Sequence, residues 1–336
     1  MELFGTFKNF VKIPFKSEIL RLFYVCMILL FIGACLSSFG PYINGVKPIS
    51  CTFEDKSINI DQGNNYCYLH GITKFPEKLL KMLNTSLCIA DQSNPDNISN
   101  YTNMPQILLS CGALFLLPLW IFINLENGLL RECKKSAEKF TALEHNFKSF
   151  FMKYVICIFV LCGMMAAVIS ILNENMNNGF VSYGWQNLNH QFSEANVTSP
   201  KCALFPNIIT CQTGSFSSAG GRSESSAICV LNFNIYYANF FVVLWCYFVF
   251  LVFAVTLNFI YWIALGCSSV LRGYMISRKA NLSMETEKKL CELCCSMSFC
   301  RFFMLYYVVK SSSDSDFIEE FINSLCDDDN DDDDIL

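Results

Sequence analysis

Four long stretches without Asp, Glu, Lys or Arg dominate the pattern of hydrophobic and polar residues along the chain. They lie between Arg21 and Lys47, Asp96 and Glu126, Lys153 and Glu174, and Glu224 and Arg272. Each contains an apolar core of about 20 residues, the length that an α-helix needs to cross the hydrocarbon core of a bilayer. The pattern therefore predicts an all-α membrane protein with four transmembrane helices.

The same pattern divides the chain into successive regions. Transmembrane helices are predicted over residues 22–43, 105–124, 153–173 and 239–267. They leave an N-terminal segment (1–21), a first long loop (44–104), a short basic loop (125–152) and a second long loop (174–238). Apolar residues at helical spacing predict a cytoplasmic helical region over 268–325. The final segment, 326–336, contains a run of Asp from Asp327 to Asp334 that is broken only by Asn330, and it is predicted to be a disordered acidic tail.

Composition supports a membrane protein. Hydrophobic residues make up 53% of the chain and charged residues only 16%, which is more apolar than is usual for a soluble domain of this length. The first apolar stretch, from Leu22 to Ile43, is longer than the hydrophobic part of a typical signal peptide. We therefore expect this stretch to be a retained anchor rather than a cleaved signal.

The positions of Lys and Arg predict the orientation. Basic residues precede the first span, fill the short loop over 125–152 and follow the fourth span. Because cytoplasmic loops carry such an excess, both termini and the short loop are predicted to be cytoplasmic. The second long loop has only Lys201 and Arg222, which fits an exterior position, whereas the first long loop carries five Lys residues and is less clear. The net charge of −5 comes from residues 311–336, which hold eleven acidic side chains and no Lys or Arg.

The two long loops, called the exterior loops below, carry six cysteines: Cys51, Cys67, Cys88, Cys202, Cys211 and Cys229. An even number of cysteines in an oxidising compartment predicts disulfides, but spacing alone does not select among the many pairings. The exterior loops also contain four Asn-x-Ser/Thr triplets, which are candidate glycosylation sites: Asn84, Asn97, Asn100 and Asn196. Both features place these loops outside the cell.

The N-terminal segment has hydrophobic residues at helical spacing over residues 2–13, followed by Pro14. This pattern predicts a short amphipathic helix. Such a helix can lie on the inner leaflet, or it can fold back into a central pore. Apart from Lys153 at the edge of the third span, the spans contain no Asp, Glu, Lys or Arg, which argues against a proton pump or voltage sensor and favours a passive conduit.

Other candidate sites have plain interpretations. Four cysteines cluster near the C-terminus: Cys291, Cys294, Cys295 and Cys300. We interpret them as ordinary thiols, with palmitoylation and a Zn²⁺ site as alternatives. The acidic tail is interpreted as a solvated segment, with weak Ca²⁺ binding and an electrostatic gate as alternatives. The residues give no sign of a catalytic cluster, a cofactor or nucleic-acid binding.

The first exterior loop contains the runs Pro48-Ile49-Ser50-Cys51 and Asn65-Tyr66-Cys67-Tyr68-Leu69-His70. These runs resemble the Pro-Ile-x-Cys and Tyr-Cys-Trp-Ile-His motifs of the innexins, the invertebrate gap-junction proteins. In the second loop, residues 205–211 and 229–235 look like that family's Phe-Pro-x-Val-Thr-x-Cys and Cys-Val-Leu-Pro-Leu-Asn-Ile. The Tyr-x-Gln-Trp-Val-Pro motif of the family keeps only its Tyr and Pro over residues 101–105, which indicates a divergent member.

The resemblance implies a ring of subunits around a wide pore in the plasma membrane, with a cytoplasmic helical dome. It implies a homo-oligomer of six to eight subunits, with eight favoured, and hetero-oligomers are an alternative. It also implies that a ring docks with a ring in the adjacent cell. It further implies the disulfides Cys51–Cys229 and Cys67–Cys211, and we hypothesise a third, Cys88–Cys202. The residues expected at the pore constriction are Glu2, Leu3 and Phe4.

The implied function is a gap-junction channel or hemichannel that passes ions and small metabolites. The alternative is a tetraspanin-like membrane organiser without a pore, which also has four spans and a cysteine-bearing loop. That family's Cys-Cys-Gly motif is missing from the second exterior loop. Neither interpretation involves an enzyme or a cofactor.

Overall fold

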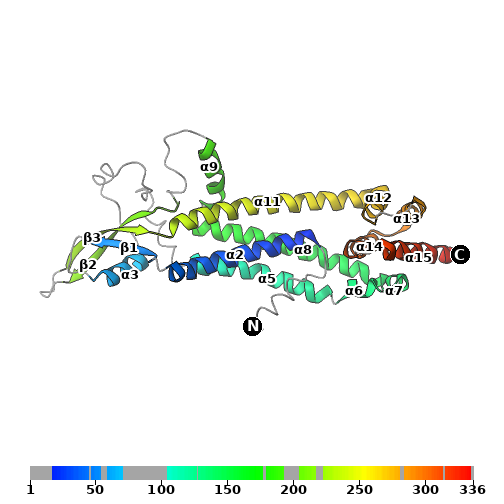
Figure 1. Ribbon diagram of the computed structural model, residues 1–336, viewed down its shortest axis with the longest axis horizontal. Coiled ribbons are helices and arrows are strands. Elements are labelled where there is room, and N and C mark those ends of the chain that lie inside the picture. Colours follow the sequence, from blue (N-terminus) through cyan, green and yellow to red (C-terminus); the bar gives the residue numbers. More distant parts are fainter. Residues whose placement is uncertain are drawn as a thin grey trace. The chain divides into compact units, whose positions relative to one another are not determined.

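The four uncharged stretches fold as four long helices in the computed structural model (Figure 1). These are α2 (Glu18–Asn44), α5 (Met104–Glu126), α8 (Phe147–Asn175) and α11 (Asn234–Cys267). All four are long and apolar enough to cross a membrane. Each contains the span predicted for it, and α2 already begins within the predicted N-terminal segment. The structure describes residues 17–44, 47–53, 59–70, 104–126, 128–176, 179–192, 204–216, 222–280, 284–312 and 315–333.

The described chain forms two compact units. The first comprises residues 1–25, 115–163 and 251–336, and the second comprises residues 26–114 and 164–250. In the second unit, α2 and α11 approach closely at Gly33, where a Cβ atom would lie 2.2 Å from the Phe240 ring. Small residues permit such approaches between membrane helices, which have no water to drive their association. Gly33 is therefore a packing residue between α2 and α11.

The exterior loops form a three-stranded antiparallel sheet and two helices in the second unit. The strands are β1 (Ile49–Phe53), β2 (Ile208–Phe216) and β3 (Arg222–Leu231), in the order β1-β3-β2. The helices are α3 (Ile60–His70) and α9 (Phe180–Phe192). The fold class is mostly helical, as predicted, but the sheet was not anticipated. The strands are short, and one of them comes from a loop more than 150 residues from the other two, so their pairing has no local signal.

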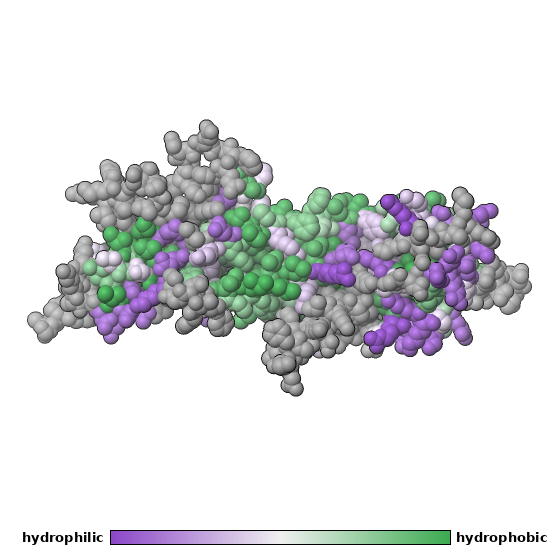
Figure 2. Space-filling view, viewed as in Figure 1, coloured by the Kyte–Doolittle hydropathy of each residue, from purple (hydrophilic) through white to green (hydrophobic). Residues whose placement is uncertain are grey.

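The first unit contains the remaining helices, and the basic loop over 125–152 is helical. Its elements are α6 (Leu129–Cys133), α7 (Ala137–Ala142), the short 3₁₀ helix η3 (Glu144–Asn146) and the start of α8. Helices α12 (Ser269–Ala280), α13 (Met284–Ser296), α14 (Phe299–Ser311) and α15 (Ser315–Asp333) form the C-terminal helical region. Figure 2 shows hydrophilic residues gathered over this region and hydrophobic residues gathered along the long helices.

Helix α15 corrects one prediction. The acidic tail was expected to be disordered from residue 326, whereas α15 continues to Asp333. The part of the helix that precedes the Asp run packs against the protein, since Phe321, Ile322 and Leu325 are buried. Once a packed helix exists, adding further residues to it is far easier than nucleating a new helix, so α15 extends into the Asp run despite the poor helix propensity of Asp.

The core of the first unit is aromatic. Trp262 of α11 packs against Phe303 of α14 with ring centroids 4.9 Å apart, and Tyr154 of α8 packs against Phe303 at 5.2 Å. Most of α14 is buried, which explains its hydrophobic residues on nearly every side. In this unit, α14 therefore packs against α8 and α11. It does so at the ends of these two helices for which the basic residues predict a cytoplasmic location.

Candidate functional site

The sheet of the exterior loops is covalently cross-linked between its neighbouring strands β1 and β3. Cys51 and Cys229 are direct partners in the β1–β3 ladder, and their sulfur atoms form a disulfide with an S–S distance of 2.01 Å. Both residues are buried, as are Ile49 and Leu231 at the end of the same ladder. This disulfide joins the first exterior loop to the second.

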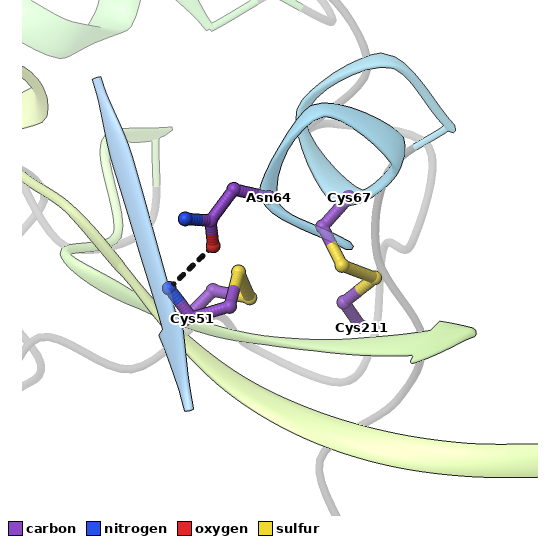
Figure 3. The surroundings of a disulfide bond; sticks show 5 residues. Cys51, Asn64, Cys67 and Cys211 are labelled. Carbon is purple, nitrogen blue, oxygen red and sulfur yellow. Dashed lines mark hydrogen bonds between the residues drawn. A yellow bond between two sulfur atoms is a disulfide. The ribbon is translucent and has the colours of Figure 1, made fainter. Parts of the chain in front are cut away.

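A second disulfide fastens helix α3 to the sheet. Cys67 of α3 bonds to Cys211 of β2 with an S–S distance of 2.03 Å. The helix also contacts β1, and Figure 3 shows Asn64 reaching from α3 toward the strand. The Cys51 backbone N–H donates to Asn64 Oδ1, with an N–O distance of 2.9 Å. Helix α3 is thus held to β2 by a covalent bond and to β1 by a buried hydrogen bond.

The sequence before α3 explains where that helix begins. Asn59 Oδ1 accepts from the backbone N–H groups of Asp61 and Gln62, at 3.0 and 3.4 Å. This is the arrangement of an N-cap, and Asn is among the residues that favour it. Gly63 then allows the helix to approach β1, because a Cβ atom there would lie 2.3 Å from the Phe53 ring.

The sulfur atoms of Cys51, Cys67 and Cys229 lie within 4.8 Å of one another, a grouping that could suit a metal ion. All three are in disulfides, and metals bind the thiolate form of cysteine. The oxidised cluster is therefore structural. Its two bonds are the same two pairs that the innexin resemblance implied.

Side chains beside the sheet connect it to the start of α11. Asn234, the first residue of α11, donates through Nδ2 to the Pro206 carbonyl, and both atoms are buried. Asn232 donates through Nδ2 to the Lys47 carbonyl at 2.9 Å. These bonds hold the segments before β1 and β2 against the residues that lead into α11. The sheet is consequently anchored to the fourth long helix as well as cross-linked internally.

Two polar contacts hold the beginning of α2 in the first unit. The buried Ser17 hydroxyl is hydrogen-bonded to the Tyr154 hydroxyl of α8 at 3.1 Å. Next to it, Glu18 Oε1 lies 3.1 Å from Lys310 Nζ of α14. These contacts fix the point at which the N-terminal segment joins the first long helix.

Arg272 of α12 holds the end of α11. Its guanidinium donates to the carbonyls of Leu265 and Gly266 at 2.9 Å, and to the Met297 carbonyl just after α13 at 3.3 Å. The carbonyls in the last turn of a helix have no partner within that helix, and a cation there also interacts favourably with the helix dipole. One side chain therefore caps α11 and ties it to the C-terminal helical region.

The cysteines of α13 differ in their surroundings. Cys294 is fully buried and Cys295 is exposed. Burial raises the pKa of the Cys294 thiol to about 12. Among the described residues, only the disulfide cluster brings three candidate ligand atoms within metal-binding range.

Several predicted site residues lie outside the described residues: Glu2, Leu3, Phe4, Cys88, Cys202, Asn84, Asn97, Asn100 and Asn196. The structure also reveals residues that the sequence analysis did not single out, namely Asn59, Asn64 and Arg272. Asn59 could have been found from its position as a cap residue before a helical stretch. Asn64 and Arg272 bond to backbone groups of other elements, and the sequence carries no signal for these bonds.

A family model for innexins matches residues 17–328. The chain belongs to the innexin family. Innexin shaking-B of Drosophila melanogaster is 21% identical over 314 residues, covering 84% of this chain and 83% of that protein. Innexin inx3 of the same species is 22% identical over 61% of this chain and 58% of its own length. Innexin inx1 of Schistocerca americana is 21% identical over 61% and 63%.

Membership defines the class of protein. Innexins are gap-junction channel proteins of the plasma membrane and are not enzymes. This innexin is accordingly a multi-pass membrane protein, in agreement with its four long apolar helices. The family model covers the long helices, the sheet and the C-terminal helical region alike, since the matched range includes nearly every described residue.

Proposed function

We propose that this innexin assembles as a ring of identical subunits around a wide pore that passes ions and small metabolites. The observation that carries the proposal is the family match over residues 17–328, which includes both cross-loop disulfides. Uncharged spans suit a conduit in which the mouths and the width set selectivity. The ring has six to eight subunits, with eight favoured, and it works either alone as a hemichannel or docked to a ring in the next cell.

The pore constriction is formed by the N-terminal residues Glu2, Leu3 and Phe4. Support comes from the contacts of Ser17 with Tyr154 and of Glu18 with Lys310, which hold the start of α2. A segment of 16 residues attached to a fixed point can reach back into a central pore. A ring of Glu2 carboxylates at that constriction would favour cations.

Reconstitution of the purified protein tests this proposal. Vesicles containing the full chain should release small fluorescent solutes, and the particles should show rings with a central hole in projection. Deleting residues 2–12 should change unitary conductance, whereas deleting residues 334–336 should leave it unchanged. Glu2→Lys should shift the reversal potential in a salt gradient toward that of anions. Sealed vesicles and monomeric particles would instead support the membrane organiser without a pore.

The candidate glycosylation sites bear on the choice between hemichannel and junction. Glycans at Asn84, Asn97, Asn100 and Asn196 would be bulky obstacles to docking, so substantial hemichannel activity is expected. Replacing all four Asn by Gln should increase dye transfer between paired cells. Equal transfer by the native and substituted proteins would contradict a block by glycans. Surface biotinylation provides the control, because both proteins must reach the membrane in equal amounts.

Cys88 and Cys202 form a third bond between the exterior loops in this proposal. Their even number beside two pairs that are already bonded supports it. Mass spectrometry of unreduced peptides should recover the Cys88 and Cys202 peptides joined together. Alkylation of both residues without prior reduction would rule the bond out.

A further inference from the structure

Helix α9 of the second exterior loop has three distinct faces. One face is buried against the protein and consists of Phe180, Tyr183, Gly184 and Asn187. A second face is polar and exposed and consists of Ser182, Gln186 and Asn189. The third is apolar and consists of Val181, Trp185 and the half-buried Leu188, with Val181 55% and Trp185 62% exposed. Residues at positions i, i+4 and i+7 form one continuous strip along a helix.

The start of α9 lies at the level where α8 leaves the membrane. The uncharged stretch of α8 runs from Tyr154 to Asn173, and about 20 helical residues span the roughly 30 Å of a bilayer's hydrocarbon core. Asn173 therefore marks the outer boundary. The Val181 backbone N–H donates to Asn173 Oδ1 at 3.2 Å, so α9 begins at that boundary.

Contacts with α11 fix the direction of α9. Trp245 donates through Nε1 to the Val181 carbonyl at 3.0 Å, and the Tyr183 hydroxyl donates to the Ala238 carbonyl at 3.0 Å. Gly184 lets the Trp245 ring lie directly against α9, since a Cβ atom there would be 2.0 Å from the ring. Figure 1 shows that α9 runs across the direction of α11 rather than along it. A helix across a membrane-spanning helix lies along the membrane surface.

We propose that α9 is an interfacial helix whose strip of Val181, Trp185 and Leu188 inserts into the outer phospholipid leaflet. Tryptophan is enriched at the boundary between headgroups and acyl chains, where its ring is partly apolar and its N–H can be hydrogen-bonded. Gly184, which lies against Trp245 of α11, is next to this strip on the surface of α9. The helix contains no Asp, Glu, Lys or Arg that would oppose insertion. It thereby anchors the second exterior loop to lipid, independently of whether the ring conducts.

The fluorescence of Trp185 tests this location in the full chain, assembled in phosphatidylcholine vesicles. Phospholipids brominated near the headgroup end of the acyl chain quench tryptophans at that depth, and aqueous iodide quenches tryptophans in water. The chain has four tryptophans, so the signal of Trp185 is the difference between the native protein and Trp185→Phe. The matched control is the double variant Trp185→Gln, Gln186→Trp, which moves the indole to the polar face of the same turn. All proteins must elute as the same oligomer.

We expect the Trp185 signal to be quenched by brominated lipid and protected from iodide. The relocated indole of the control should show the opposite. Quenching of Trp185 by iodide alone would show that the strip faces water and would overturn the proposal. Protection from both quenchers would show that a neighbouring subunit covers it, which would overturn the proposal equally. If Trp185→Phe does not assemble, Trp185→Tyr provides the same difference with a more polar ring.

Discussion

Lys310 of α14 and Glu18 of α2 form an ion pair with an Nζ–Oε1 distance of 3.1 Å. The Lys310 side chain is only 13% exposed, and its ammonium group lies 6.0 Å from the ring centroids of Tyr306 and Tyr307. A charge in such surroundings depends on its partner more than a surface charge does. The pair therefore ties the C-terminal helical region to the residue at which the first long helix begins.

Glu18→Gln should destabilise the protein because it leaves the Lys310 charge poorly solvated and without its carboxylate. The expected loss is about 1 kcal/mol, intermediate between an exposed and a buried pair, because Glu18 itself is largely exposed. The apparent melting temperature of the detergent-solubilised oligomer should fall by a few degrees. Glu132→Gln is the matched control, since Glu132 pairs with Lys135 on the surface at 2.6 Å. Equal effects of the two substitutions would contradict the special role of Lys310.

Arg272→Lys should destabilise the junction between α11 and the C-terminal helical region. A lysine ammonium cannot reproduce the planar fork that bonds the carbonyls of Leu265, Gly266 and Met297, so the partly buried bonds to Leu265 and Met297 are weakened or lost. The expected cost is about 1–3 kcal/mol, measured as a lower melting temperature of the oligomer. Arg278→Lys, at an exposed position of the same helix, should have no measurable effect.

The membrane-spanning part of this fold could be predicted from sequence because its physical cause is local. An uncharged apolar stretch must satisfy its own backbone in lipid, and only a helix does so within one segment. The predicted span over 153–173 lies inside α8 for that reason. The two disulfide pairs came from a resemblance rather than from spacing, and the structure contains the same pairs.

The sheet and the polar contacts could not be predicted because they join residues far apart in the chain. Cys51 pairs with Cys229 across a separation of 178 residues, and nothing around either residue specifies the register. The same holds for Arg272, whose neighbours in α12 give no sign that it bonds a carbonyl at the end of α13. Local composition also misjudged the Asp run, because the packing of Phe321 and Ile322 upstream of it decides that α15 forms.

Asn64→Ala should loosen helix α3 from the sheet while leaving both disulfides intact. The substitution removes the acceptor for the buried Cys51 N–H, and an unsatisfied buried donor costs about 1–3 kcal/mol. Hydrogen exchange of the peptide that contains residues 49–53 should become faster. Asn65→Ala changes an exposed neighbour and should leave that exchange rate as it is. Unchanged exchange in both variants would mean that the disulfides alone hold α3.

Cys294 and Cys295 should react very differently with a maleimide in the folded, detergent-solubilised protein. The nucleophile is the thiolate, and burial raises the pKa of Cys294 to about 12, so at pH 7–8 this residue stays protonated as well as inaccessible. Cys295 is exposed and should be modified first.

Mass spectrometry of the α13 peptide after a short reaction measures both sites, and denaturation before labelling should make them equally reactive. Because burial disfavours the charged form of the Cys294 thiol, Cys294 should remain unmodified when the pH is raised from 7 to 8. Rapid labelling of Cys294 in the folded protein would show that α13 opens away from its neighbours, and equal protection of Cys295 would indicate that this thiol already carries a modification such as palmitate.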